Sequence, residues 1–403
     1  MSQLIFLSLA LWISSADAYP QLLPLTKFSS SDLSLVDGSE NGALLFVAST
    51  DDNKYLRNIK ITNGVTTITM DHLNDINRDG TPKSLEINGD LYVSTSNNET
   101  ITKSLTGNIY VTTRAQAKDP TFSVIVVKNP YSFYRDALRS TVVILNTQLQ
   151  QDNTKGDQPS KVSYVTDIQH SSNTPLYFKR GIPTSEETIN NIFYSNPIVL
   201  NNGSDTYQVF IDHVEPLQIG LECWYIIGEG PYGISLDSKY VDDHNYKTTA
   251  SNTTGIILSN GQFQNHVVDF KPEMGKKGTS GVFYSSVINP NSNVGIYLEA
   301  GTGIDSTILN GTIGTRSSFY TSEQATRLTV NTTTPLPGSI YVQYFTISGD
   351  IYPLTDPPRN FDTTTVGQTP GPTSAPIFPT TQGSSFIFGA QSLILLFVFV
   401  FLF

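Results

Sequence analysis

Short runs of β-branched and aromatic residues recur along most of this chain, and they constrain its fold more than any other feature. Glycine, proline, asparagine, serine and threonine separate the runs, as they commonly do between strands. The clearest runs are ALLFVA at 43–48, FSVIVV at 122–127, STVVIL at 140–145, YQVFI at 207–211 and SIYVQYFTI at 339–347. This pattern predicts an all-β chain of two or three antiparallel β-sandwiches in tandem, with few short helices.

The segment NIKITNGVTTITM, residues 58–70, predicts a hairpin. Ile59 and Ile61 alternate with polar residues, and the same alternation resumes after the turn. Asn63-Gly64 fits a two-residue turn, because glycine adopts positive φ without steric cost. We therefore expect two paired strands joined at these two residues.

Two segments of the chain resemble each other and suggest a division into units. NIYVTTRAQAKDPTFSVIVV, residues 108–127, and RLTVNTTTPLPGSIYVQYFT, residues 327–346, each contain two strand-like runs around a Thr-rich loop with a proline. Because strand–turn–strand patterns are common in β proteins, chance similarity is an open alternative. On this basis we expect β units at residues 19–128, 129–215 and 216–348.

The first residues have the features of a secretory signal. LIFLSLALWI has the length of a signal-peptide core and is too short to span a bilayer. ADA at 16–18 matches the small-x-small pattern of a cleavage site, although no Lys or Arg precedes the apolar core. We expect a signal peptide at residues 1–18, cleaved after Ala18.

The last residues, 386–403, form an apolar tail that no charged residue follows. Small residues before such a tail are the signal for a GPI anchor, and Gly383, Ser384 and Ser385 supply them. The alternative is a tail-anchored or single-pass helix, which needs about 20 apolar residues. We expect GPI attachment at these three positions, and therefore a protein of the secretory pathway held in the outer leaflet of the plasma membrane.

Residues 349–385 are rich in threonine and proline. Proline stiffens such a segment, and threonine offers hydroxyls for O-linked glycans. The composition predicts a stalk between the β units and the membrane.

Charge restricts the class of partner. The chain has 35 acidic and 24 basic residues, for a formal net charge of −11 at pH 7. An acidic surface repels phosphate backbones and anionic lipid headgroups. The composition therefore argues against nucleic acid as a partner.

Cys223 is the only cysteine, so no disulfide can form within the chain. Secreted domains often rely on disulfides, and here stability must come instead from the burial of apolar side chains. The surrounding LECWYII favours a cysteine that is buried in a strand. A free nucleophile and an intermolecular disulfide are the alternatives.

Five Asn-x-Ser/Thr sequons occur in the chain. In a secreted protein each is a candidate site for N-glycosylation on the surface. The asparagines are Asn98, Asn202, Asn252, Asn310 and Asn331.

Residues 75–86 match the spacing of an EF-hand calcium loop. The strand-like VTTITMDHL before the loop and the glycine in INGDLYV after it do not predict the two helices that an EF-hand needs. Two interpretations are open: a calcium loop on a β scaffold with Asp75, Asn77 and Asp79 as ligands, or an Asp-Gly turn without metal. We predict a tight acidic turn at 75–80 that binds calcium weakly, and we expect no other cofactor.

Catalytic motifs are scarce. GTSG at 278–281 lacks the G-x-S-x-G pattern of a nucleophile elbow. The histidines do not show the H-x-x-x-H or H-x-H spacing typical of zinc ligands. These histidines are His72, His170, His213, His244 and His266. The sequence therefore predicts that the protein is not an enzyme.

The cysteine-poor β units, strand endings such as NIYVTTRAQAKDPTFSVIVV, the Thr/Pro stalk and the apolar tail together resemble the nematode CUB-like family of secreted and surface proteins. The resemblance covers residues 19–128 best and residues 216–348 more loosely. It implies jelly-roll β-sandwiches and a non-enzymatic extracellular protein, often linked to innate immune defence. CUB domains usually contain disulfides, which this chain lacks.

Two functions are compatible with these features. The first is a GPI-anchored protein of cell-surface binding or adhesion that contacts an extracellular protein or glycan through loops. The second is a structural glycoprotein of a surface coat without a specific ligand. An exposed patch of loop aromatics would favour the first, and glycans shielding every face would favour the second.

Overall fold

The computed structural model describes residues 18–28, 33–149, 158–170, 173–184, 191–202, 204–263, 265–289, 292–301, 303–332 and 336–351. The chain divides into two units, residues 1–366 and 367–403, and all described residues belong to the first. Residues 1–17 of the predicted signal peptide, nearly all of the predicted stalk, the GPI attachment residues and the apolar tail lie outside the described residues.

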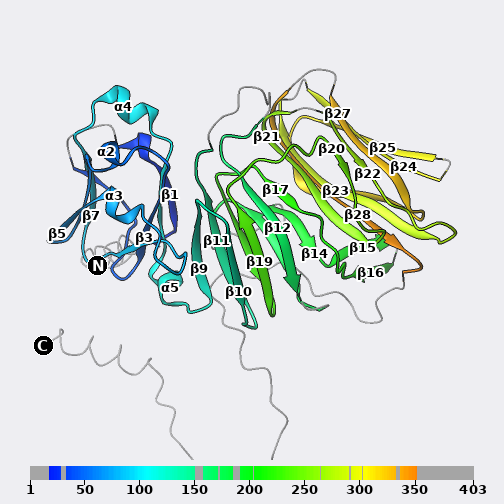
Figure 1. Cartoon of the computed structure of the whole chain (residues 1–403), viewed down its shortest axis with the longest axis horizontal. Coiled ribbons are helices and arrows are strands. Elements are labelled where there is room, and N and C mark those ends of the chain that lie inside the picture. The colour runs from blue at the N-terminus through cyan, green and yellow to red at the C-terminus, as the bar shows by residue number, and fades with distance from the viewer. Residues whose placement is uncertain are drawn as a thin grey trace, which may run out of the picture. The chain divides into compact units, whose positions relative to one another are not determined.

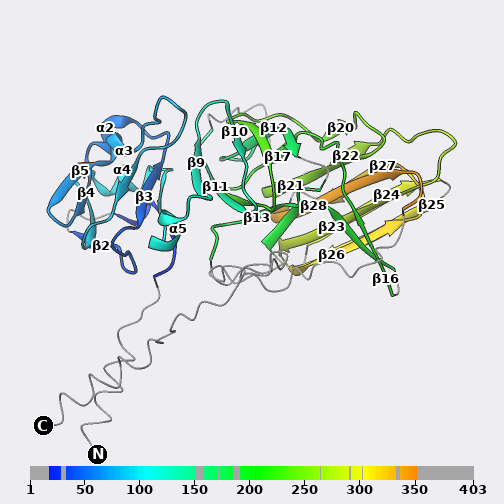
Figure 2. The same cartoon turned by 90° about the horizontal axis from the view of Figure 1, so that it is seen from below.

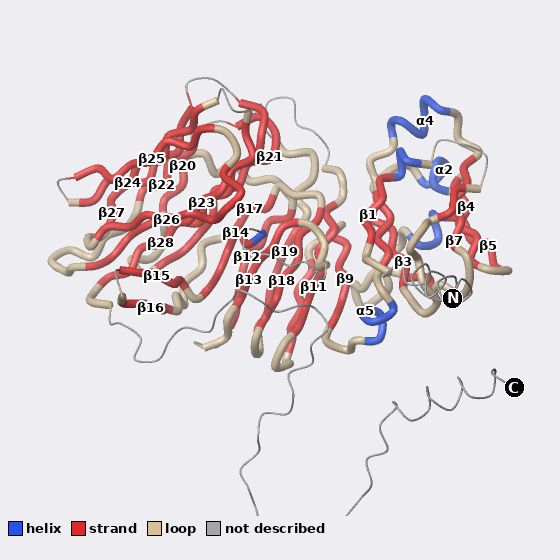
Figure 3. Tube along the Cα trace, turned by 180° about the vertical axis from the view of Figure 1, so that it is seen from behind, coloured by secondary structure: helices blue, strands red, loops and turns tan. Residues whose placement is uncertain are grey.

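Strands dominate the described residues, and the predicted all-β class is confirmed (Figure 3). Most neighbouring strands pair antiparallel, as between β4 (Ile59–Asn63) and β5 (Thr66–Thr69). The helices in the described part are short. They are α2 (Asn53–Leu56), α3 (Met70–Leu73), α4 (Glu99–Ser104), α5 (Arg114–Lys118) and the 3-10 turn η1 (Leu25–Lys27).

The first sandwich has two four-stranded sheets (blue to cyan in Figure 1). One sheet has the order β1 (Gln21–Pro24), β8 (Asn108–Val111), β3 (Leu44–Ala48) and β6 (Ser84–Glu86). The other has the order β2 (Ser34–Leu35), β7 (Leu91–Thr95), β4 and β5. Alternate residues of β3 and β4, such as Leu45 and Ile61, face each other in a shared buried core.

The second sandwich joins a five-stranded and a four-stranded sheet. The five-stranded sheet has the order β14 (Ile192–Asn196), β13 (Leu176–Arg180), β18 (Cys223–Gly228), β11 (Ser140–Asn146) and β9 (Phe122–Val127). The four-stranded sheet has the order β10 (Tyr131–Arg135), β19 (Tyr232–Asp237), β12 (Ser163–His170) and β17 (Leu217–Ile219). Trp224 is fully buried between the sheets, where its ring packs on Phe178 and Phe193.

The third sandwich contains the longest strands (Figure 2). One sheet has the order β20 (Asn245–Lys247), β22 (His266–Asp269), β27 (Ala325–Thr332), β24 (Asn293–Ala300) and β25 (Gly303–Asn310). The other has the order β21 (Thr253–Phe263), β28 (Leu336–Ser348), β23 (Gly278–Ile288) and β26 (Ile313–Thr321). A separate hairpin, β15 (Ile198–Asn202) and β16 (Asp205–Val209), packs Ile198 and Leu200 against Phe345 of β28.

Strand pairing runs across the unit boundaries that we placed at residues 128 and 215. β9, which precedes the first boundary, pairs parallel with β11, which follows it. β11 and β13 both pair with β18, and β10 pairs with β19, so strands from 129–215 share sheets with strands from 216–237. The physical reason is that a strand takes its hydrogen-bond partners from anywhere in the chain, whereas the boundaries rested on local similarity.

The first and second sandwiches contact each other through a second apolar layer. Phe46 and Tyr110, on the outer faces of β3 and β8, form a buried cluster with Val143, Cys223 and Tyr225 on the outer face of the β11–β18 sheet. Strands such as β9, β11 and β18 are therefore buried on both faces. This explains why their sequences are continuous apolar runs instead of alternating ones.

The predicted hairpin at residues 58–70 is present as β4 and β5, with its turn one residue later than expected. Asn63 pairs with Thr66, so the two turn residues are Gly64 and Val65. Gly64 has φ +58°, and a Cβ there would lie 2.4 Å from the Asn88 carbonyl oxygen. The close approach of the Asn88 carbonyl requires glycine at position 64. This contact comes from a distant segment and is not evident from the local sequence.

Candidate functional site

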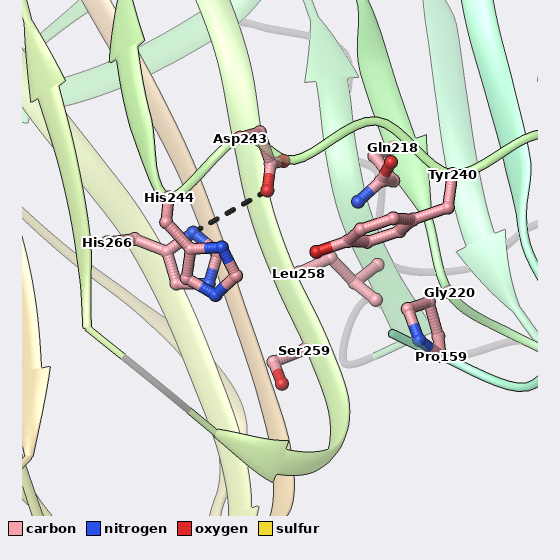
Figure 4. Close-up of a pocket in the computed structure, with 9 residues that line it drawn as sticks. All are labelled: Pro159, Gln218, Gly220, Tyr240, Asp243, His244, Leu258, Ser259 and His266. Carbon is pink, nitrogen blue, oxygen red and sulfur yellow. Dashed lines mark ion pairs between the residues drawn. The ribbon is translucent and has the colours of Figure 1, made fainter. Parts of the chain in front are cut away.

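A pocket lies beside residues 238–244, which join β19 of the second sandwich to β20 of the third (Figure 4). Strands of both sandwiches contribute to its wall. The lining residues are Pro159, Gln218, Gly220, Tyr240, Asp243, His244, Leu258, Ser259 and His266. Polar and aromatic groups that are far apart in the sequence therefore meet at the junction of two domains, where ligand sites often form.

Hydrogen bonds hold the joining segment against both sandwiches. The backbone N–H of Val241 donates to Oε1 of Gln218 on β17, at 2.7 Å. The backbone N–H of Val267 on β22 donates to the carbonyl oxygen of His244, also at 2.7 Å. β20 then continues parallel to β22. As a result His244, which precedes β20, lies beside His266, the first residue of β22.

The two imidazole rings form a stacked pair, and Figure 4 shows them one over the other. Their centroids are 4.3 Å apart, with 21° between the ring planes. His266 is only 4% exposed. Each ring has its own carboxylate: Nδ1 of His244 lies 2.6 Å from Oδ1 of Asp242, and Nδ1 of His266 lies 3.7 Å from Oδ1 of Asp243.

Burial controls the protonation of His266. Loss of solvent, and then the neighbouring His244, lower the pKa of His266 to about 3. Both effects disfavour the imidazolium form, because a buried charge loses its hydration and two cations repel. The hydrogen bond from His244 lowers the pKa of the exposed Asp242. His266 is therefore neutral at physiological pH.

Ser259 lies in the same pocket, so a hydroxyl, two imidazoles and a carboxylate line one site. A general base is most effective when its pKa is near the working pH. With a pKa of about 3, His266 is a weak base, and its ring stacks on His244. His266 is therefore poorly suited to act as a general base at this pocket.

Glu215 is a buried acid near the same junction, only 1% exposed. Its Oε2 accepts a hydrogen bond from the hydroxyl of Tyr246 at 2.7 Å. Its Oε1 accepts from the backbone N–H of Thr249 and the hydroxyl of Thr253, both at 2.9 Å. Burial and then the bond to Glu215 raise the pKa of Tyr246. This network fastens the second sandwich to the first strands of the third.

Residues 75–80 form the predicted tight acidic turn. The backbone N–H of Gly80 donates to the carbonyl oxygen of Asn77 at 3.0 Å, and Gly80 has φ +84°. The short helix α3 precedes the turn, although we expected a strand there. The side chains of the three predicted ligands contact protein groups: Asp75 pairs with Lys83 at 2.8 Å, and Asp79 and Asn77 bond the Thr81 hydroxyl at 2.6 and 3.1 Å.

We expect calcium to bind this turn only weakly, with a dissociation constant of about 10⁻⁴–10⁻³ M. A bound ion would have to replace the Lys83 ammonium at Asp75 and the Thr81 hydroxyl at Asp79. Calorimetric titration of the full chain with calcium, repeated on Asp75→Ala, measures this. Micromolar affinity that Asp75→Ala abolishes would contradict the expectation, because it would require all three side chains to converge on the ion.

In the described part of the chain, the acidic turn included, no three His, Cys, Asp or Glu side chains are grouped so that they could hold a metal ion.

A family described as transmembrane glycoprotein matches residues 40–398, which is most of the chain. The chain belongs to this transmembrane glycoprotein family. Comparison with curated proteins gives no match. Among solved structures, an insecticidal delta-endotoxin from Bacillus thuringiensis is similar over 46% of this chain and 42% of its own length, with 8% identity and a TM-score of 0.14. The chain thus spans less than half of that protein.

A second solved structure, from Sulfolobus turreted icosahedral virus, is similar over 78% of this chain and 82% of its own length, with 9% identity and a TM-score of 0.17. Neither TM-score is high enough to assign a common fold.

Membership of the transmembrane glycoprotein family indicates a glycoprotein with a membrane or surface location, and it is compatible with a protein that is not an enzyme. The matched family is different from the CUB-like family that the sequence resembled, and it gives no support to a role in innate defence. Within the described residues, no helix is long and apolar enough to cross a membrane.

The structure places four of the five sequon asparagines at outward positions. Asn98, Asn252 and Asn310 are exposed, and Asn331 is partly exposed. Asn98 caps α4 by accepting from the backbone N–H of Ile101, and Asn252 accepts from that of Ser348. These bonds use Oδ1, whereas an N-glycan attaches to Nδ2. Asn202 lies in β15, and its side chain is outside the described part.

Cys223 is buried in the layer between the first and second sandwiches, as predicted, with 5% exposure. Its thiol donates to the carbonyl oxygen of Gly181 at 3.3 Å. Burial, and then the charge of Glu222, raise the pKa of the thiol well above its usual range. A thiol in this setting is a poor nucleophile, because the thiolate is the reactive form.

Sequence reasoning missed the two groups that define the junction. His244 and His266 are brought together by the parallel pairing of β20 and β22, which their spacing does not reveal. Glu215 follows an unremarkable strand, and only its burial distinguishes it. Ser280 of GTSG is buried in β23, where its hydroxyl accepts from the backbone N–H of Ala325 at 2.7 Å. That segment is therefore a strand.

Proposed function

We propose that this chain is a non-enzymatic surface glycoprotein, attached through a GPI anchor, that acts in cell-surface binding or adhesion. The observation that carries the proposal is the outward placement of sequon asparagines in a member of the transmembrane glycoprotein family. N-glycans are added in the secretory pathway, so such positions suit an extracellular protein. The apolar tail and the small residues at 383–385 support the GPI anchor.

The distribution of sequons favours binding over a structural coat. The outer sheet of the second sandwich, β10, β19, β12 and β17, contains no asparagine and therefore no sequon. Its outward residues include Tyr134, which is 62% exposed, and Ser132 and Ser235, whose hydroxyl oxygens are 2.8 Å apart. Asp167 and Gln169 are exposed on the adjacent strand β12.

A coat that shields every face would place glycans on this sheet as well. An exposed tyrosine ring surrounded by serine hydroxyls, a carboxylate and a side-chain amide is instead suited to binding an extracellular protein or glycan ligand. We therefore assign the ligand-contacting role to this face of the second sandwich, next to the loops at its ends. This assignment differs from our expectation from sequence, which placed the contacts on loops alone.

We expect phosphatidylinositol-specific phospholipase C to release the full-length protein from intact cells that express it, because the enzyme cleaves the lipid from a GPI anchor. Release is measured by immunoblotting the medium and the membranes. In a control variant with Gly383→Leu, Ser384→Leu and Ser385→Leu, loss of the small residues should prevent attachment and surface display. Retention after treatment, with residues 386–403 still detected by mass spectrometry, would show a spanning anchor.

A further inference from the structure

The outer face of the β20–β22–β27–β24–β25 sheet carries two sequons and an unusual apolar surface. Leu328 and Val330 of β27 point into the core of the third sandwich. Because side chains alternate along a strand, Asn331 points to the opposite, outer face. The same alternation on β25, where Leu309 is in the core, places Ile308 and Asn310 outside.

Tyr297 on β24 lies on this outer face, opposite the core residues Ile296 and Leu298. Its ring lies over Gly295, where an added Cβ would meet ring atom Cε2 at 2.3 Å. Gly295 pairs with Asn331 of β27 on one side and with Ile308 of β25 on the other. The tyrosine ring therefore lies between a sequon asparagine and an aliphatic side chain.

Two aliphatic residues of β25 are more than half exposed to solvent. Ile308 is 56% exposed and Ile304 is 64% exposed, on the same face and two positions either side of Ser306. Tyr297 pairs with Ser306 on the same face, so apolar side chains gather here, and an apolar patch on a protein surface commonly marks a contact. Asn331 lies on this face one strand beyond Gly295, on the side of β24 away from Ile308.

We propose that an N-glycan on Asn331 packs its first sugar on the ring of Tyr297 and against Ile308, so that the glycan forms part of the surface of the third sandwich. Side chains of paired residues on adjacent strands have Cβ atoms about 5 Å apart, within reach of a sugar linked to Nδ2. The C–H groups of a pyranose carry partial positive charge and suit the negative face of an aromatic ring. The proposal rests on the proposed function, which makes Asn331 a glycosylated residue.

Asn310 supplies a matched control within the same sheet. It is exposed at the end of β25 and pairs with Asn293, so no aromatic residue stands beside it in the register. A glycan at Asn310 is therefore expected to extend into solvent. Both sequons lie on the same face of the third sandwich, but only Asn331 is paired with Gly295, over which the Tyr297 ring lies.

A double-mutant cycle between the glycan and the ring tests the proposal. Full-length protein is purified from cultured eukaryotic cells as wild type, Tyr297→Ala, Asn331→Gln and the double variant, and thermal unfolding is followed for each. Tyr297→Ala should lower Tm by about 2–4 °C more in the wild-type background than in Asn331→Gln. In the Asn310→Gln background, the full effect of Tyr297→Ala should remain.

A second readout does not depend on thermal unfolding. A peptide N-glycanase should remove the glycan of the folded protein more slowly from Asn331 than from Asn310, and Tyr297→Ala should remove that difference. Equal removal rates, or equal Tm losses in both backgrounds, would overturn the proposal. Glycopeptide mass spectrometry distinguishes failure of this proposal from failure of the proposed function. If Asn331 carries no glycan while Asn98 and Asn310 do, this proposal alone is overturned. If none of the sequons carries a glycan, the proposed function is overturned as well.

Discussion

Replacing Glu215 with alanine is expected to lower the free energy of unfolding by about 3 kcal/mol. The carboxylate is buried and accepts hydrogen bonds from Tyr246, Thr249 and Thr253. Alanine would leave these donors buried without an acceptor, and their desolvation would no longer be offset. Denaturant unfolding of the full chain, with the midpoint and slope measured together, gives the change in stability.

A surface acid provides the matched control for this change. Glu99 on α4 is exposed and pairs with Lys103 at 2.6 Å, an arrangement that contributes little because water screens it. Glu99→Ala should change the free energy of unfolding by less than about 1 kcal/mol. If Glu215→Ala costs no more than Glu99→Ala, the network does not fasten the second sandwich to the third.

Acidification is expected to destabilise the fold between pH 6.5 and pH 3 because of His266. Burial, followed by the neighbouring His244, lowers the pKa of His266 to about 3 in the folded chain, from an ordinary value of 6.5. Between these values the unfolded chain binds a proton that the folded chain does not. The free energy of unfolding is therefore unaffected by protonation of His266 above pH 6.5 and decreases as pH falls below it. In this range His266 alone should raise the unfolding equilibrium constant about tenfold for each unit by which the pH is lowered.

The His266→Gln variant isolates this contribution, because glutamine does not titrate. Whatever its stability at neutral pH, the dependence of its unfolding free energy on pH should be shallower by the amount that His266 supplies. His72→Gln on α3, an exposed position, should keep the wild-type pH dependence. Urea unfolding at several pH values between about 4 and 7 measures all three proteins. Parallel pH profiles for wild type and His266→Gln would show that the buried ring titrates normally.

The strand content of this protein could be predicted from its sequence because strand formation depends on local chemistry. ALLFVA, FSVIVV and STVVIL contain β3, β9 and most of β11, and LECWYII contains most of β18. Their β-branched and aromatic side chains fit a pleated, buried surface. The burial of Cys223 follows from the same run, and the positive φ of Gly80 follows from the Asp-Gly turn.

The candidate site could not be predicted in this way. The H-x-H and H-x-x-x-H spacings typical of zinc ligands describe histidines that are close together in the sequence. They carry no information about histidines on strands that pair across a longer interval. His244 and His266 are 22 positions apart, and only the parallel register of β20 and β22 stacks their rings. Likewise, Tyr297, Asn331 and Ile308 become neighbours only because three strands align at Gly295.

The sequence by itself determined that the chain is built from short strands, that its lone cysteine is buried without an intrachain disulfide, and that residues 75–80 turn sharply at a glycine. Each of these follows from side-chain shape, apolar character or backbone freedom within a few residues. The tertiary structure decided which strands share a sheet, and with that the histidine pocket, the Glu215 network and the outer face beneath Asn331. Those features depend on the register between distant strands, which is set by how whole apolar faces fit together and has no signature in any one segment.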